Sequence, residues 1–143
     1  MNNCKITNLT AFLPAKDFQL CCKFYEELGF KKTVSIEGAV RYELDSFGFW
    51  LKDYYVKEYA ENTMLCLYVP DIQSWYNRIE KIDIGKNYNG LAKVFSKPHE
   101  EHGSLVMQLG DPSGILWHIF EVATQVAALG KLEPIQVSAF VGQ

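Results

Sequence analysis

The sequence has no long apolar run, no cysteine framework and no excess of positive charge. Its apolar stretches fall far short of the roughly 20 residues that cross a bilayer, so we expect no membrane-spanning helix. The four cysteines include no C-x-x-C pair, which excludes a zinc ribbon and a disulfide framework. A formal net charge of −3 argues against a general nucleic-acid binder. A Gly-rich phosphate loop and a serine nucleophile elbow are missing too.

The composition is that of one ordinary globular domain. Of the 143 residues, 48% are hydrophobic and 22% are charged, and this balance excludes extensive disorder. We therefore expect a single domain over residues 1–143. The N-terminus has no apolar segment behind a basic start, so we expect no secretory leader and a cytoplasmic protein with reduced thiols.

A degenerate repeat divides the chain into two modules. In both halves a strand-like apolar segment leads through Asp17 or Asp71 into a segment with apolar residues at i, i+3, i+4 and i+7. This spacing predicts two amphipathic helices, each capped by its aspartate. Gly29 is expected to end the first helix. The turn sequences 45–48 and 111–114 then occupy corresponding places before a last strand.

Each half is therefore predicted to be a βαβββ unit in an α+β fold. Module one covers about residues 5–56 and module two about residues 62–122. The strands that follow the helices are expected at Thr33–Glu37, Ala39–Leu44, Phe49–Tyr54, Leu91–Ser96, Ser104–Leu109 and Ile115–Val122. A C-terminal extension, 123–143, keeps apolar residues and is interpreted either as an arm on a second subunit or as a strand covering its own sheet edge.

Alternation along the strands separates a core face from a mixed face. Leu9, Ala11 and Leu13 are expected to pack under the helices, as are the corresponding residues of the fifth and eighth strands. The opposite face combines aromatic rings with polar and sulfur-bearing side chains: Thr10, Phe12, Trp50, Lys52, Tyr54, Met64, Cys66, Tyr68, His118 and Phe120. Such a face indicates a ligand cavity, and dimer packing or simple core packing are the other interpretations.

Two segments of the chain resemble known family signatures. Leu13–Asp17 followed by Phe24–Phe30, and Asp111–Gly114 followed by Leu116–Trp117, are similar to signatures of the glyoxalase/bleomycin-resistance/dioxygenase (vicinal oxygen chelate) superfamily. The resemblance covers about residues 5–122. It implies two βαβββ modules that form half-open curved sheets with helices on the outside, and a homodimer. Within the superfamily the pattern resembles bleomycin resistance proteins most, which sequester a drug in crevices at the dimer interface without altering it.

The superfamily's metal-dependent members hold a divalent ion through His, Glu or Gln. The resemblance places these ligand positions, on the first, fourth, fifth and eighth strands, at Thr10, Lys52, Met64 and His118. Threonine is a poor ligand, methionine suits soft metals, and lysine brings a competing positive charge. Because a catalytic site needs about three protein ligands, we predict no metal, no cofactor and no catalytic residue here.

Other side chains that could rescue a chemical site are weak candidates. Glu121 lies three residues beyond His118 and so points to the opposite face. His99 and His102 are spaced i, i+3 in a predicted loop with no third ligand nearby in sequence. Cys66 shares the mixed face with His118, either as half of a Cys–His pair or as a small buried hydrophobe. His118 itself is either a pocket hydrogen-bonding group or a satisfied core histidine.

These observations predict a metal-free small-molecule binding protein. The expected partner is a small aromatic ligand, with antibiotics among the candidates, held by ring stacking and cation–π attraction. The candidate ligand-binding residues are Phe12, Trp50, Lys52, Tyr54, Met64, Tyr68, His102, His118 and Phe120. The resemblance alone suggests His102, which falls near a loop aromatic that the drug binders use for stacking.

The charge of Lys52 bears on the kind of ligand. It would repel a cationic drug such as bleomycin unless Glu43 or Asp53 pairs with it, so an anionic aromatic ligand fits it better. Two other functions stay open on the sequence: a metal-dependent lyase or dioxygenase with an atypical site, and a module that binds another protein.

Overall fold

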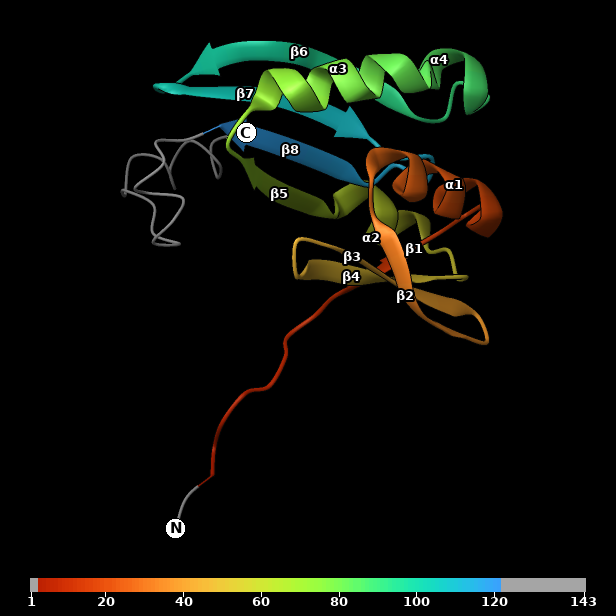
Figure 1. Ribbon diagram of the computed structural model, residues 1–143. Helices are drawn as coiled ribbons and strands as arrows, with labels where there is room; N and C mark the ends of the chain where they lie inside the picture. Colours follow the sequence, from red (N-terminus) through yellow and green to blue (C-terminus); the bar gives the residue numbers. More distant parts are fainter. Residues whose placement is uncertain (1–2, 122–143) are drawn as a thin grey trace.

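The computed structural model describes residues 3–121, which form two four-stranded sheets flanked by helices (Figure 1). Sheet A has the order β1-β4-β3-β2, from strands Phe12–Pro14, Phe47–Lys52, Ala39–Leu44 and Lys31–Ile36. Sheet B has the order β5-β8-β7-β6, from strands Met64–Val69, Leu116–Glu121, Ser104–Gly110 and Lys93–Glu101. In sheet A strand β1 runs parallel to β4, and in sheet B strand β5 runs parallel to β8. The other neighbouring pairs are antiparallel. The predicted α+β fold of two βαβββ modules is confirmed.

The two long helices begin where the sequence places their caps. Helix α1, Phe18–Leu28, starts after Asp17, whose carboxylate accepts a hydrogen bond from the Leu20 N–H at 3.1 Å. It ends at Gly29, which has a φ of +110° that side chains other than glycine disfavour. Helix α3, Ile72–Ile82, starts after Asp71, whose carboxylate accepts from the Ser74 N–H at 3.2 Å. Both predicted helices are confirmed.

Two short helices are additions that the periodicity does not reveal. Helix α2, Lys57–Asn62, connects the modules, and helix α4, Ile84–Asn87, follows α3. A segment of four to six residues is too short to display a helical stripe. Within residues 3–121, the structure has no helix that is both long and apolar enough to cross a membrane. The C-terminal extension predicted at 123–143, like Val122, lies outside the described residues.

One aromatic core joins the two modules. The ring of Tyr25, on α1, packs edge-to-face on Phe49 of β4, with centroids 4.8 Å apart. It also lies 5.9 Å from Trp117 of β8, which belongs to module two. All three side chains are buried, and the main apolar cluster includes residues from both sheets and both long helices. Helix α1 therefore packs against both modules, which share a single core.

The turn before β8 anchors α1 through a buried carboxylate. Asp111 is fully buried and accepts a hydrogen bond from the Tyr25 hydroxyl at 2.6 Å. It also accepts from the backbone N–H groups of Ser113 at 2.8 Å and Ile115 at 2.9 Å. Trp117 Nε1 donates to the Tyr25 hydroxyl at 3.1 Å. Burial raises the pKa of Asp111 to about 6, against the opposing effect of these hydrogen bonds.

The first strand is shorter than the alternation predicts. Strand β1 begins at Phe12, and Leu9 and Ala11, which were expected to pack under the helices, are exposed, Leu9 to 88%. Directly before β1, the Ala11 carbonyl accepts a hydrogen bond from the Trp50 N–H at 2.9 Å, and the Thr10 hydroxyl accepts one from Arg41. The segment before β1 then extends away from both sheets (Figure 1). That part of the prediction is wrong because alternation does not report where pairing with a neighbour ends.

Two other strand boundaries also differ from the prediction. Strand β4 covers Phe47–Lys52 and so ends before Tyr54, which lies beyond it. Strand β6 continues to Glu101, which places His99 in a strand and corrects its assignment to a loop. The pairing of β6 with β7 shifts register twice, on either side of Ser96. An edge strand with such irregularities tolerates Pro98, the residue that favoured a loop in the sequence.

Candidate functional site

The helix-free side of sheet A carries aromatic and cationic side chains. Strand pairing places Phe12 beside Trp50 and Trp50 beside Arg41, so the three side chains share one face. Lys52 lies on that face two residues beyond Trp50, while Leu51 between them is buried in the core. We call this surface the sheet A face, and its residues are Phe12, Arg41, Trp50, Lys52 and Tyr54.

The aromatic rings of the sheet A face form an open stack with a cation beside it. Phe12 and Trp50 stack with centroids 5.9 Å apart and planes inclined by 22°. The Phe12 side chain is 58% exposed, so its ring is available to a further planar group. Lys52 Nζ lies 6.0 Å from the Phe12 ring and 5.3 Å from the ring of Tyr54. A surface with exposed rings and one ammonium group can bind a flat molecule.

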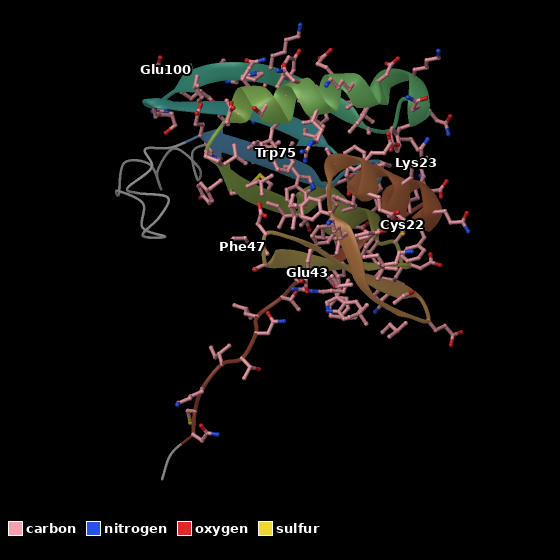
Figure 2. All side chains as sticks on the ribbon, viewed as in Figure 1. Cys22, Lys23, Glu43, Phe47, Trp75 and Glu100 are labelled. Carbon is pink, nitrogen blue, oxygen red and sulfur yellow. The ribbon has the colours of Figure 1, made fainter. Side chains whose placement is uncertain are left out.

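Arg41 is a residue of this face that the sequence pattern alone did not single out. It is buried, and its Nε donates to Glu43 Oε1 at 3.3 Å while Nη1 donates to the hydroxyl of Thr10. Figure 2 shows Glu43 beside the place where the N-terminal segment joins sheet A. Glu43 therefore neutralises Arg41, and the alternative in which Glu43 pairs with Lys52 has no support in the ion pairs of the described residues. Alternation over 39–44 could have placed Arg41 on this face.

The helix-free side of sheet B has different chemistry. Pairing of β5 with β8 places Cys66 beside His118 and Tyr68 beside Phe120. Phe120 stacks with Tyr68 at 6.0 Å and 25°, and with His118 at 6.0 Å and 17°. Tyr68 is 40% exposed, whereas His118 and Phe120 are only 3% and 2% exposed. We call this surface the sheet B face, and its residues are Met64, Cys66, Tyr68, His118 and Phe120.

His118 has a buried nitrogen without a hydrogen bond. Its Nδ1 lies 3.4 Å from the amide nitrogen of Gln108, and no hydrogen-bond partner lies within reach of Nε2 in the described structure. Burial lowers the pKa of His118, and the nearby charge of Glu101 only partly opposes this effect. Because the Gln108 amide nitrogen can only donate, Nδ1 accepts and the neutral ring carries its proton on Nε2. This buried N–H has a desolvation cost that a hydrogen-bond acceptor on a ligand would relieve.

Cys66 lies beside His118 in register, as the alternation predicted, but it is not built as a nucleophile. Burial raises the pKa of the Cys66 thiol, against a smaller lowering by its hydrogen bond with Tyr68. A raised pKa keeps the thiol protonated, and only the thiolate attacks efficiently. A Cys–His pair is therefore not supported, and the other interpretation, a small buried hydrophobe, is wrong because Cys66 as a whole is exposed although its sulfur is partly desolvated.

The predicted binding residues lie in three places and not in one. Phe12, Trp50, Lys52 and Tyr54 belong to the sheet A face, and Met64, Tyr68, His118 and Phe120 to the sheet B face. His102 lies in the turn between β6 and β7, exposed and with a φ of +51°. Each ring contact among these predicted residues joins residues of the same sheet.

The four positions of the superfamily's metal ligands do not fit a divalent ion. The Thr10 hydroxyl already accepts a hydrogen bond from Arg41, and Lys52 brings a positive charge. Met64 and His118 offer one thioether and one imidazole, which is short of the usual three ligands. Among residues 3–121, no group of three His, Cys, Asp or Glu side chains is placed to hold a metal.

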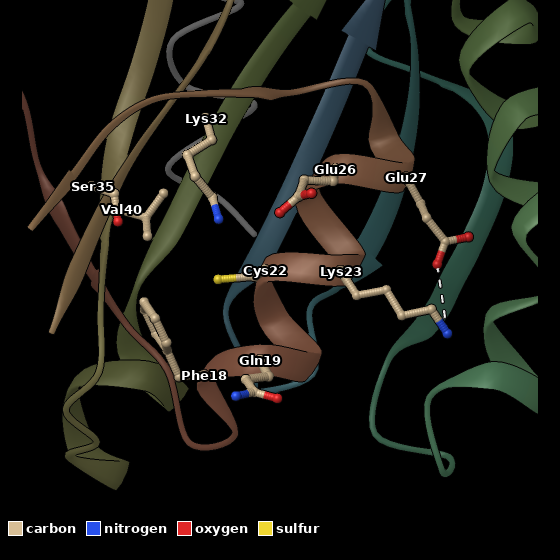
Figure 3. A pocket seen from close by; sticks show the side chains of 9 residues that line it. All are labelled: Phe18, Gln19, Cys22, Lys23, Glu26, Glu27, Lys32, Ser35 and Val40. Atoms are coloured by element: carbon tan, nitrogen blue, oxygen red, sulfur yellow. Dashed lines mark ion pairs between the residues drawn. The ribbon is translucent and has the colours of Figure 1, made fainter.

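A separate open groove lies between α1 and the β2–β3 hairpin (Figure 3). It has a volume of about 780 Å³, and Cys22 and Lys32 point into it from opposite sides. Its acidic groups already have partners, since Tyr42 donates to Glu26 at 2.6 Å and Lys23 lies 3.9 Å from Glu27. Burial raises the pKa of the Cys22 thiol. The groove is an open surface whose charges balance, without a feature that selects a ligand.

Comparisons with known proteins show the fold. No family model matches the sequence, and the search of curated proteins found no match. A bleomycin-binding protein complexed with bleomycin superimposes with a TM-score of 0.68 at 22% identity, over 82% of this chain and 100% of that one. The bleomycin-binding protein of Streptomyces verticillus, complexed with copper(II)-bleomycin, gives 0.67 at 16% identity, over 83% and 100%. A lactoylglutathione lyase from Agrobacterium tumefaciens gives 0.59 at 17% identity, over 82% and 95%.

These neighbours confirm the predicted resemblance at the level of the fold. The chain has the vicinal oxygen chelate fold, with two βαβββ modules and open sheets. Because the neighbours include both binding proteins and a lyase, the fold by itself fixes neither ligand nor reaction.

Proposed function

We propose that this chain binds a small aromatic molecule, with antibiotics among the candidates, and holds it without chemical change. The observation that carries the proposal is the stack of Phe12 on Trp50, open to solvent on the helix-free side of sheet A. Exposed stacked rings add a further planar group at a small entropic cost because each has only two side-chain torsions. Two of the solved neighbours are bleomycin-binding proteins, which supports a binding role.

The proposed binding unit is a homodimer in which the sheet A face of one copy and the sheet B face of another enclose a crevice. The sheet B face would supply Tyr68 for stacking and the unpartnered Nε2 of His118 for a hydrogen bond. Size-exclusion chromatography with light scattering tests this arrangement. A monomer at the concentrations at which ligand binds would contradict the shared crevice and leave single-face binding.

Tryptophan fluorescence tests the stack directly. Planar aromatic compounds, bleomycin included, are titrated against the protein, and binding on the stack is expected to quench Trp50. A Trp50→Phe variant should lose the quenching, whereas Trp75→Phe should keep it, because Trp75 lies on α3 under Arg78. Thermal shift with the same panel gives an independent readout. Quenching that is unchanged in Trp50→Phe would contradict a ligand on this face.

The second candidate is a metal-dependent lyase, which the lactoylglutathione lyase neighbour and the buried His118 nitrogen favour. The donor set argues against it, since Thr10 is engaged by Arg41 and Lys52 is cationic. Elemental analysis of the purified protein distinguishes the two. A divalent metal at one equivalent per chain that is lost in a His118→Ala variant would overturn the binding proposal in favour of the lyase.

A further inference from the structure

Lys52, one of the two cations of the sheet A face, has no anionic partner in the described structure. Lys52 is exposed and contacts the rings of Phe12 and Tyr54, and no carboxylate of residues 3–121 lies within the 4.0 Å of an ion pair. Glu43, a carboxylate on the same face, is engaged by the buried Arg41 at 3.3 Å. Arg41 and Glu43 therefore form an ion pair, and the ammonium group of Lys52 has no carboxylate partner among the described residues.

Asp53 does not supply the missing negative charge on that face. It follows Lys52 directly in a bend beyond the end of β4, and none of the ion pairs of the described residues joins its carboxylate to Lys52. Its backbone N–H donates to the carbonyl of Gly38 at 2.8 Å, which fixes the chain at the β2–β3 turn. The pairing that would have made the face neutral toward a cationic drug is thus missing from both candidate carboxylates.

We propose that the sheet A face selects a planar aromatic anion, with the ring stacked on Phe12 and Trp50 and a carboxylate paired with Lys52. The inference rests on the proposed function and names the class of ligand. Lys52 Nζ lies 6.0 Å from the centroid of the Phe12 ring, so the cation lies beside the ring on which a planar ligand would stack. Lys52 also repels cationic aromatics, so the same side chain supplies both attraction and exclusion.

Three isosteric probes test the charge. Naphthalene-2-carboxylate, the neutral 2-naphthamide and 2-naphthylmethylammonium carry the same ring, so stacking is common to all three. By calorimetry at about 20 mM salt we expect the carboxylate to bind about tenfold more tightly than the amide, and the ammonium more weakly than the amide. At about 500 mM salt, the difference between carboxylate and amide should shrink, because screening acts on the partly exposed ion pair.

Variants of one lysine separate charge from stacking. Lys52→Met keeps an apolar stem on the face, so we expect it to bind carboxylate and amide equally and to keep the amide affinity. Lys52→Glu should reverse the order and favour the ammonium. Lys81→Met, on the exposed last turn of α3, is the matched control and should keep the preference of the unaltered chain. Circular dichroism and melting curves establish that all variants fold.

The outcomes separate this inference from the proposed function. Equal binding of the three probes to the unaltered chain, or a carboxylate preference that survives Lys52→Met, overturns the anion selectivity and leaves the aromatic binding site standing. Failure of every probe to bind, with no quenching of Trp50 by any aromatic compound of the wider panel, overturns both. A tenfold preference that is lost only in the Lys52 variants supports both.

Discussion

On β4, Trp50 and Lys52 point to the helix-free side of sheet A, and on β8, Leu116 and His118 occupy the equivalent places of sheet B. The residues between them, Leu51 and Trp117, are both buried in the shared core. The side of each strand that packs under a helix is apolar in both modules, whereas the other side is cationic in one and neutral in the other. Packing against a helix requires apolar residues on one side of each strand, and it places no such requirement on the helix-free side.

The turns that precede β4 and β8 also differ in chemistry although they occupy corresponding places. Asp111 is fully buried and holds α1 through Tyr25, whereas Asp45, at the corresponding place in module one, is exposed with a φ of +52°. A sequence motif that recurs in a repeat can therefore serve a structural role in one copy only. The comparison also separates the DPSG-like signature from binding, since Asp111 acts in the core.

The largest expected effect contrasts these two aspartates. Asp111→Ala would leave the Tyr25 hydroxyl and two backbone N–H groups without their acceptor in the core. We expect a loss of about 4 kcal/mol in the free energy of unfolding. Asp45→Ala should change it by less than about 0.5 kcal/mol because the side chain is exposed. Denaturant unfolding measures both, and equal losses would refute the assignment of a structural role to Asp111 alone.

The next effect contrasts neighbouring residues of β4. Leu51→Ala removes a fully buried side chain and should cost about 3 kcal/mol of unfolding free energy. Lys52→Ala, one residue further, should change stability by less than about 0.5 kcal/mol, since Lys52 is exposed. A large loss in Lys52→Ala would mean that the sheet A face is structural, which would weaken the case for a binding surface.

The pH dependence of stability tests the burial of Asp111. Its pKa in the folded chain is about 6, above the ordinary value near 3.8, so the folded state holds the proton more tightly than the unfolded state does. This contribution to stability is complete below about pH 4 and is lost as the pH rises through 6. The loss is up to about 3 kcal/mol. Asp111→Asn should remove it, and the measurement is the difference between the two unfolding curves from pH 4 to 7; an unchanged difference would contradict the raised pKa.

The smallest effect concerns ligand affinity on the sheet A face. Phe12→Ala removes the exposed half of the stack and should weaken binding of a planar ligand by about five- to tenfold, or about 1 kcal/mol. Phe47→Ala is the matched control, because Phe47 is an exposed ring whose position on β4 faces the other side from Trp50. Calorimetry with the naphthyl probes gives both affinities. A similar loss in both variants would show that the effect is not local to the stack.

The sequence predicted those parts of the fold that depend on neighbours in the chain. Asp17, Gly29 and Asp71 bound their helices by local hydrogen bonds, so the two long helices could be placed closely. The alternation of buried and free residues on β4 was predicted for the same reason, whereas on β8 the residues Trp117–Phe120 are all buried. It did not reveal that β1 is only three residues long, because the length of a strand is set by the partner that it pairs with.

The candidate site was predicted less well because its chemistry depends on distant contacts. The residues of both faces were named, but the sequence could not show that they lie on two separate surfaces of one chain. Arg41 was missed, although it pairs with Glu43 and so leaves Lys52 without that carboxylate as a partner. Its role follows from contacts with Thr10, 31 residues away, and with Glu43. The unpartnered nitrogen of His118 likewise appears only once the packing around it is known.

Because the sheet A and sheet B faces differ, the way in which two chains assemble would set how many ligands the pair can hold. If a twofold axis brings each sheet A face onto the sheet B face of the other copy, two equivalent crevices form, each with Lys52 on one wall and His118 on the other. An axis through the sheet A faces instead makes a single crevice that contains both Lys52 side chains. A count of bound molecules per pair therefore reports the subunit arrangement without a structure of the complex.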